Sequence, residues 1–330
     1  MSSRSPLLCV VAFTALLMNE VQALTKGHDL SSVRLVEKEQ GAVWYNTKGK
    51  GTPIEDILGS GGMDSVRLRT WTSTLLQGGL GYKIYLDMHF SDTWADPTKQ
   101  ATPTSFNAAS VTTLAASARA YVSSTLKSFT AAGVTLDIVS LGNEITYGFM
   151  WPTGKISSGN YANFATLWKA ARQGVNDAVA AGTPKPKVMI HIDNGWKYTT
   201  VSSFFSGLFA TGTVSTSDVD VFGFSFYPIS ALNTSLTQIA GEYNKPLYNV
   251  SLSADYPVSP EGQVQWVKAI EEVLEGLPNG LGAGIYYWEP AYIKVASLGS
   301  SCQSALLFDV DWGNASQANA TALSSVDMFA

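Results

Sequence analysis

The amino-acid sequence predicts an α/β protein, a single (β/α)8 barrel, on three observations. Short runs of β-branched or apolar residues recur along the chain, segments of helix length separate most of them, and no repeat or linker divides the chain. This alternation favours a parallel barrel over an open sheet, with one domain over residues 24–330. The eight predicted strands are 30–36, 65–71, 84–90, 136–143, 188–193, 219–225, 246–250 and 284–288.

Three of the intervening segments carry clear helical patterns. Residues 108–132 and 161–181 are rich in helix formers, and residues 263–274 place their apolar side chains on one helical face. One connection is shortened. Only 12 residues, 72–83, join the second and third predicted strands. This length is at the lower limit for a crossover that includes a helix, which needs at least about 10 to 12 residues. We therefore expect this crossover to lack a full helix.

The composition argues against two classes of partner. Only 14% of the 330 residues are charged, against about 25% in an average protein, and the formal net charge is −5. The chain has no basic stripe for nucleic acid or for an anionic membrane. Its 9 Trp, 14 Tyr and 14 Phe residues suit a protein that handles neutral ligands.

Residues 1–23 are expected to be a signal peptide. Arg4 precedes an apolar run over residues 6–18, and Val21-Gln22-Ala23 has the small-residue pattern of a cleavage site. A membrane anchor needs roughly 20 continuous apolar residues, and Asn19-Glu20 interrupts this run. We therefore expect a secreted, extracellular protein. Four glycosylation sequons agree with this, at Asn233, Asn249, Asn314 and Asn319.

Cys302 is the only cysteine left once a signal peptide containing Cys9 is removed. A single thiol is unusual in a protein that enters an oxidising compartment. Two interpretations stay open: a buried, inert thiol, or a cysteine that has lost its partner.

Polar side chains gather where the barrel strands end. Residues two apart along a strand share a face, and a barrel carries its active site at the C-terminal ends of its strands. Asp87 and His89 share one side of the third strand, opposite an apolar side suited to packing under helices. Arg67, Arg69 and Trp71 share a side of the second strand, and later strands end in His191, Asp193, Tyr227 and Trp288.

The fourth strand ends in Asn143-Glu144, which resembles the acid/base motif of retaining glycosidases built on this barrel. A carboxyl group beside apolar walls favours its protonated form, as protonation of a glycosidic oxygen requires. Asn143 has the chemistry to hold a sugar 2-hydroxyl. The alternative is a helix start in which Asn caps the first turn.

Longer strings around these strand ends resemble glycoside hydrolase family 53, the arabinogalactan endo-β-1,4-galactanases, from about Leu24 to the C-terminus. The strings are DMHFSDTWADP (87–97), SLGNEITYGFMWPTG (140–154), KVMIHIDNGW (187–196), FGFSFYP (222–228), and YYWEPAYI with LGSSC (286–302). The resemblance implies a retaining, endo-acting enzyme whose partner is β-1,4-galactan or arabinogalactan, the side chains of pectin.

Site roles follow from the resemblance, position by position. Glu144 would be the proton donor, and Trp94 and Trp288 would be platforms for sugar rings, although each tryptophan could equally fill the core. Family members can carry calcium in a long loop after the seventh strand, but this chain lacks the length, so we assign no metal and no cofactor. We expect a monomer. The predicted substrate-binding residues are Arg67, His89, Trp94, Asp96, Asn143, His191, Asp193, Tyr227 and Trp288.

The chain departs from the family at the second carboxylate. Retaining catalysis needs a nucleophile about 5 to 5.5 Å from the acid, and the family supplies a Glu at the end of the seventh strand, expected here near Ser251 to Ser253. No Glu is present there. A missing block would remove both this Glu and the partner that the family supplies for Cys302. Asp255, Glu261 and Glu289 are weaker candidates, because Asp255 is short and Glu289 belongs to the ordinary YWEP run.

Three interpretations follow. The chain is an imperfect copy of a secreted galactanase, altered at two places by splicing or by an error in the gene model; or it is a galactan-binding protein without catalysis; or it is a secreted protein with no sugar site.

Overall fold

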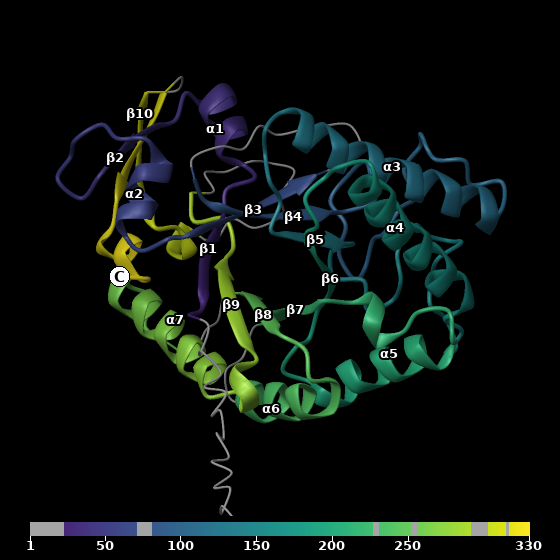
Figure 1. Ribbon diagram of the computed structural model, residues 1–330. Helices are drawn as coiled ribbons and strands as arrows, with labels where there is room; N and C mark the ends of the chain where they lie inside the picture. The colour runs from purple at the N-terminus through teal and green to yellow at the C-terminus, as the bar shows by residue number, and fades with distance from the viewer. Residues whose placement is uncertain (1–22, 71–80, 227–230, 252–255, 292–302, 315–316) are drawn as a thin grey trace, which may run out of the picture.

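The computed structural model describes residues 23–70, 81–226, 231–251, 256–291, 303–314 and 317–330 (Figure 1). The expected signal peptide falls on residues 1–22, outside the described residues. None of the described helices is both long and apolar enough to span a membrane.

Eight parallel strands close into a barrel, which confirms the predicted fold. The strands pair in the order β1-β3-β4-β5-β6-β7-β8-β9, and β9 pairs back onto β1. Seven of the eight predicted strands coincide with barrel strands. The barrel strands are β1 (Thr25–Asp29), β3 (Ser65–Thr70), β4 (Lys83–Met88), β5 (Ile138–Leu141), β6 (Lys187–Ile192), β7 (Val221–Phe226), β8 (Leu247–Ser251) and β9 (Gly282–Tyr287).

The prediction of a strand over residues 30–36 is wrong. The first barrel strand is β1, and the helix α1 (Val33–Gln40) follows it. Val33 and Val36 are both buried, which fits helical rather than strand spacing. The sequence of β1, TKGHD, is too polar to be recognised as a buried strand, because its Asp29 is neutralised by arginines from other parts of the chain.

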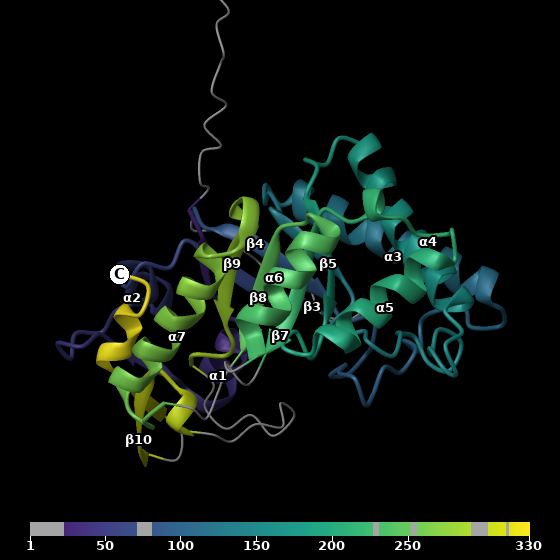
Figure 2. The same cartoon turned by 90° about the horizontal axis from the view of Figure 1, so that it is seen from below.

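Helices surround the barrel on its outer side (Figures 1 and 2). Ser110 caps α3 by accepting a hydrogen bond from the Thr113 N–H, and Ser259 caps α7 in the same way, with Pro260 in the first turn. The helices expected over 108–132, 161–181 and 263–274 are confirmed as α3, α4 and α7. The helices after α1 are α2 (Ile54–Ser60), α3 (Val111–Ala131), α4 (Ala162–Ala180), α5 (Tyr198–Ala210), α6 (Leu232–Tyr243) and α7 (Pro260–Glu275).

The two ends of the described chain meet in a small second sheet. It has the order β10-β11-β2, from β2 (Val43–Tyr45), β10 (Phe308–Asn314) and β11 (Gln317–Ala322). In Figure 1 it lies beside α1 and α2, at the edge of the barrel. Lys26 on β1 also donates a hydrogen bond of 3.1 Å to the carbonyl of Phe329. The C-terminal segment is thus joined to the first strand, an arrangement that the sequence did not predict.

The connection between β3 and β4 is short, as expected. The two strands pair in parallel, Ser65 opposite Lys83, and residues 71–82 join them. Whether this crossover lacks a helix concerns residues 71–80, which lie outside the described residues.

The barrel interior is apolar at one level and polar at the next. Toward the N-terminal ends of the strands lies a small apolar cluster. Two residues further along three of these strands, on the same face, lie the buried polar side chains of Asp87, Ser140 and His191. On the other side of β4, Leu86, Met88 and Phe90 belong to the main core under the helices. The interior cluster is Tyr85, Ile138, Met189, Val221, Tyr248 and Tyr286.

Candidate active site

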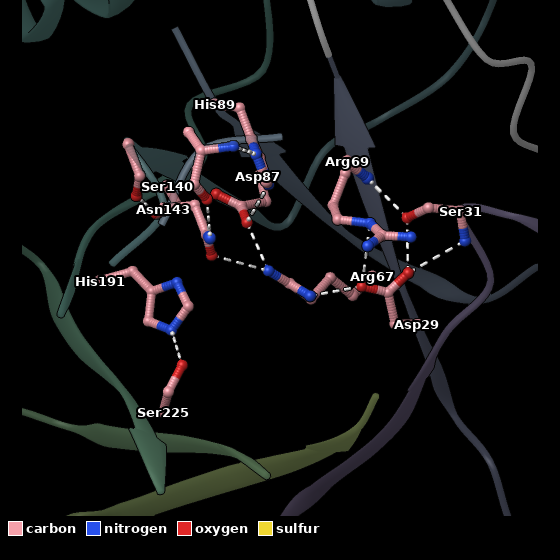
Figure 3. A network of polar contacts seen from close by, with 12 residues as sticks. Asp29, Ser31, Arg67, Arg69, Asp87, His89, Ser140, Asn143, His191 and Ser225 are labelled. Carbon is pink, nitrogen blue, oxygen red and sulfur yellow. Dashed lines mark hydrogen bonds and ion pairs between the residues drawn. The ribbon is translucent and has the colours of Figure 1, made fainter. Parts of the chain in front are cut away.

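Arg67 occupies the centre of the polar level of the barrel (Figure 3). Its guanidinium forms ion pairs with Asp29 of β1 and Asp87 of β4, and it donates a hydrogen bond of 3.1 Å to the Asn143 side-chain oxygen. Burial alone lowers the Arg67 pKa, but the charges of Asp29 and Asp87 outweigh it and raise that pKa. Burial likewise raises the Asp87 pKa, and Arg67 overcomes this and holds it well below its usual range. Arg67 and Asp87 are therefore both charged at every ordinary pH.

Arg69 connects this cluster to the eighth barrel strand and to an aromatic ring. It forms an ion pair with Glu289, lies 3.5 Å from Asp29, and places its Cζ atom 4.9 Å from the centre of the Trp94 ring. Ser32 donates a further hydrogen bond of 2.8 Å to Glu289. Burial lowers the Arg69 pKa to about 10. Glu289 is therefore an ion-pair partner of Arg69, which agrees with the expectation that its role is structural.

His89 is held in one tautomer. Its Nδ1 atom accepts a hydrogen bond of 3.3 Å from the Ala95 N–H, and its Nε2 atom lies 3.4 Å from Asp87, so the proton belongs on Nε2. Burial lowers the His89 pKa, opposed by Asp87. The ring packs edge-on against Trp94 at 5.3 Å between centroids. His89 thus orients the loop that carries Trp94.

Asn143 and Glu144 follow the end of β5. The Asn143 amide nitrogen donates to the Ala95 carbonyl at 2.8 Å, and Gln100 donates to the Asn143 backbone carbonyl at 2.8 Å. Glu144 has a φ of 51°, in the left-handed region where a side chain other than glycine is strained. Such strain persists only when the surroundings hold the residue in place. Here the neighbouring Asn143 provides three fixed contacts.

Glu144 has the electrostatic setting of a general acid. Burial raises its pKa to about 7, and the negative charges of Asp193 and Asp96 act in the same direction, while Ser225 and Arg67 oppose them. A carboxyl group with this pKa keeps a large protonated fraction near neutrality, so it can donate a proton there.

The fifth barrel strand contributes His191 and Asp193 beside this acid. His191 Nε2 lies 3.1 Å from the Ser225 hydroxyl, and burial holds the His191 pKa at about 3, so the ring is neutral. Asp193 forms hydrogen bonds with the side chains of Thr146 and Asn194. Burial raises the Asp193 pKa.

Asp96 lies in the loop after β4 and stabilises it. The Thr98 N–H and hydroxyl donate to Asp96 at 2.8 and 2.6 Å, and Lys99 is 3.4 Å away. Burial raises the Asp96 pKa, but these contacts outweigh it and lower that pKa. Asp96 therefore presents a negative charge to the side of the site that holds Glu144.

The comparisons with known proteins identify the family. The model of glycosyl hydrolase family 53 matches residues 25–79 and 77–329. The chain belongs to this family. It is similar to the arabinogalactan endo-β-1,4-galactanase A of Aspergillus niger, 38% identical over 327 residues, with 88% of this chain and 91% of the relative covered. A probable arabinogalactan endo-β-1,4-galactanase A of Aspergillus tubingensis is 39% identical, with the same coverage.

Solved structures show the same architecture for this family 53 hydrolase. A structure of fungal β-1,4-galactanases superposes with a TM-score of 0.80 at 33% identity, covering 93% of this chain and 99% of the other. A family 53 catalytic domain from Ignisphaera aggregans gives a TM-score of 0.78 at 24% identity, covering 93% and 95%. The split of the family match falls within residues 71–82, the short connection between β3 and β4.

Two aromatic side chains of this family 53 chain meet beside the charged cluster. The rings of Trp94 and Trp288 are 6.0 Å apart at 69°, and both are partly buried. Glu289, directly after Trp288, has a φ of 48°, and its ion pair with Arg69 fixes the turn. Arg69 therefore contacts one ring directly and holds the turn that follows the other.

Several predicted positions cannot be placed. Tyr227, Ser253, Asp255 and Cys302 lie outside the described residues. Ser251 ends β8, and this strand, Leu247–Ser251, contains no carboxylate. Glu261 is exposed in the first turn of α7.

The structure also adds residues that the sequence analysis missed. Asp29 was missed because its strand was not recognised. Gln100 and Thr146 lie in loops, where no strand alternation marks a side chain as inward. Residues 145–148, which follow Glu144, belong to a string that resembles the family, but nothing in their sequence indicates that Thr146 contacts Asp193.

Proposed function

We propose that this protein acts on β-1,4-galactan of arabinogalactan, with Glu144 as the proton donor. The observation that carries the proposal is the environment of Glu144, whose pKa is raised to about 7 by burial at the end of β5. The activity named for the Aspergillus relatives supplies the substrate class.

Glu144 donates its proton to the glycosidic oxygen as the bond to the anomeric carbon breaks. Asn143 is fixed beside it and retains hydrogen-bonding capacity, because an amide has two N–H groups and an oxygen with two lone pairs. One N–H is used by Ala95 and the oxygen accepts one bond from Arg67. The rest are available for the 2-hydroxyl of the sugar.

Trp94 and Trp288 form the platform that receives the apolar face of a galactosyl ring. Their partial exposure and their edge-on contact hold two aromatic surfaces in a fixed arrangement. The neutral His191 and the charged Asp193 complete the polar rim. Tyr227 belongs to the same proposed rim.

The retaining mechanism needs a second carboxylate that attacks the anomeric carbon. We propose that the chain as written lacks it, because residues 251–253 contain no Glu or Asp. A galactan-binding protein without catalysis is the alternative function, and the same absence favours it. We further propose that the protein is secreted and acts as a monomer in a single domain over residues 24–330, after removal of residues 1–23.

An aryl β-galactobioside with a good leaving group tests both proposals, with and without sodium azide. Azide enters the space left by a missing carboxylate, forms a bond to the anomeric carbon as the bond to the phenolate breaks, and gives the α-galactosyl azide. We expect phenolate release only with azide. Release without azide, with a β-configured product, would show that a nucleophile exists and would support a complete galactanase.

A chain that neither binds galactan nor responds to azide would contradict the proposed function. The origin of the defect is tested separately, by sequencing the mature transcript across codons 71–84 and 247–263. A transcript that encodes a Glu and a Cys near position 251 restores the galactanase. A transcript that matches the chain supports the binding function.

A further inference from the structure

A hollow lies between the loop after β5 and the first half of α5. Its volume is about 470 Å³, within the usual range of small-molecule sites. No residue predicted to bind substrate lines it. The lining residues are Thr146, Tyr147, Ile156, Ser158, Gly159, Tyr161, Thr199, Thr200, Ser203 and Phe204.

The wall of this hollow begins at the loop that carries the acid. Thr146 is two residues after Glu144, and its hydroxyl is hydrogen-bonded to Asp193, whose charge raises the Glu144 pKa. The Ile145 N–H donates to the His191 carbonyl at 3.1 Å. The hollow is therefore connected to the acid by the same short segment that β6 holds in place.

Tyr147 is an exposed aromatic residue in a fixed position. Its side chain is 51% exposed, yet its backbone carbonyl accepts hydrogen bonds from the Ile156 N–H at 2.9 Å and from the Trp151 indole at 3.1 Å. Gly148 allows the close turn that follows, because a Cβ there would lie 2.0 Å from the Gly154 carbonyl oxygen. An aromatic surface that is both exposed and held in place is suited to binding, since little conformational freedom is lost.

The remaining lining has the chemistry of a neutral, hydroxyl-bearing ligand. None of the lining residues is charged, which disfavours an ionic ligand. Among the described residues, the side-chain hydroxyls of Ser158, Thr199, Thr200 and Ser203 make no hydrogen bond with one another or with a neighbour. Their donors and acceptors are free for the hydroxyls of a sugar.

We infer that this hollow is a subsite for one neutral sugar unit on the leaving-group side of Glu144, an inference that rests on the proposed function. The Trp94 and Trp288 pair is built from β9 and the loop after β4, whereas the hollow lies against the loop after β5 and the helix after β6. Glu144 follows β5, between them along the barrel. A galactan chain that places its scissile link at Glu144 thus has an aromatic surface on each side, and Tyr147 is the one beyond the leaving oxygen.

The test is calorimetric titration with β-1,4-galacto-oligosaccharides of two to six units. The variants are Tyr147→Ala, which removes the aromatic surface, and Ser203→Phe, which fills the hollow from an exposed position of α5. The matched control is Ser206→Phe, because Ser206 is an exposed serine on the same helix that does not line the hollow. In the unaltered chain we expect affinity to rise with oligosaccharide length. In both variants we expect this rise of affinity with length to be lost. Affinity for the longest ligand should fall about two- to tenfold, which is the size of one aromatic contact.

Galactobiose binding and the thermal midpoint should not change, because Tyr147 and Ser203 are exposed. If both variants bind the longest ligand as the control does, or if short and long ligands weaken equally, the subsite is refuted while the proposed function stands. If the unaltered chain binds no galacto-oligosaccharide, the proposed function fails and the subsite with it.

Discussion

Replacing Arg67 with methionine removes the cation that lies between two buried carboxylates. Arg67 is 2% exposed, and Asp29 and Asp87 are fully buried. Asp29 keeps other partners, the Ser31 N–H and hydroxyl at 3.0 and 2.5 Å and Arg69 at 3.5 Å. Asp87 retains the contact with the neutral His89 ring at 3.4 Å, which does not replace the charge of Arg67. Removing one partner of a buried pair costs about 3–5 kcal/mol, and we expect most of that loss at Asp87.

The assay is urea unfolding followed by tryptophan fluorescence at pH 7 and at pH 4. The Asp87 pKa is depressed in the folded protein, so its stabilising effect is present above the unfolded pKa of about 3.9 and is lost as pH falls through the folded value. In Arg67→Met the folded Asp87 pKa rises above the unfolded value. The unpaired Asp87 charge then destabilises the variant at pH 7, and this destabilisation disappears when Asp87 is protonated. The difference in free energy of unfolding between variant and parent therefore narrows toward pH 4.

Two further variants make the test decisive. Arg67→Met with Asp87→Asn removes the unpaired charge and should recover part of the loss. Arg34→Met removes an exposed arginine, 75% accessible beside Glu37, and should leave the free energy of unfolding nearly unchanged. A loss below about 1 kcal/mol for Arg67→Met, or a loss that is the same at both pH values, would refute the reasoning.

Three other outcomes are expected. Titration of ¹³C-labelled glutamate by NMR should give Glu144 a pKa of about 7, and Asp193→Asn should lower that pKa because a like charge is removed; an ordinary value in the parent would contradict the acid assignment. Gly27→Ala should destabilise by about 1–3 kcal/mol in urea unfolding, since a Cβ there would lie 2.3 Å from the Tyr286 ring, whereas Gly51→Ala, where a Cβ would meet only the Tyr45 ring at 4.0 Å, serves as the control for glycine replacement. Trp288→Ala should weaken galactan retention in affinity gels about two- to tenfold, and unchanged retention would remove Trp288 from the platform.

The barrel was predictable because seven of its strands coincide with short runs of β-branched or apolar residues, and segments of helix length separate most of these runs. The first strand was not, because Asp29 and His28 make it look like a loop. The burial of Asp29 depends on Arg67, 38 residues later in the chain, and no local pattern reports such a partner. The small sheet of β2, β10 and β11 was missed for a similar reason, since it joins segments from opposite ends of the sequence.

The candidate site followed from strand alternation wherever a strand supplies the side chain. Alternation placed Arg67, Asp87 and His89 on the inner face correctly. It does not extend to loops, so Gln100 and Thr146, which hold Asn143 and Asp193 in place, could not be found. Nor could the pKa of Glu144 be assigned in size from sequence, because it depends first on how deeply the carboxyl group is buried, and then on charges from the loop after β4 and from the end of β6.

The raised pKa of Glu144 does not depend on a carboxylate in β8, and this separates the two halves of the proposed chemistry. In a pair of carboxylates, each charge raises the pKa of the other. Here the Glu144 pKa is already raised by burial and by Asp193 and Asp96, without a carboxylate in Leu247–Ser251. A glutamate is therefore introduced in turn at positions 251, 252 and 253, and the rise that it causes in the Glu144 pKa reports its distance from Glu144. The variant that raises the Glu144 pKa furthest places its carboxylate nearest, and the same variant should release phenolate from an aryl β-galactobioside without azide. If no position shifts the Glu144 pKa, the end of β8 does not face the acid, and the nucleophile must be sought elsewhere in the barrel.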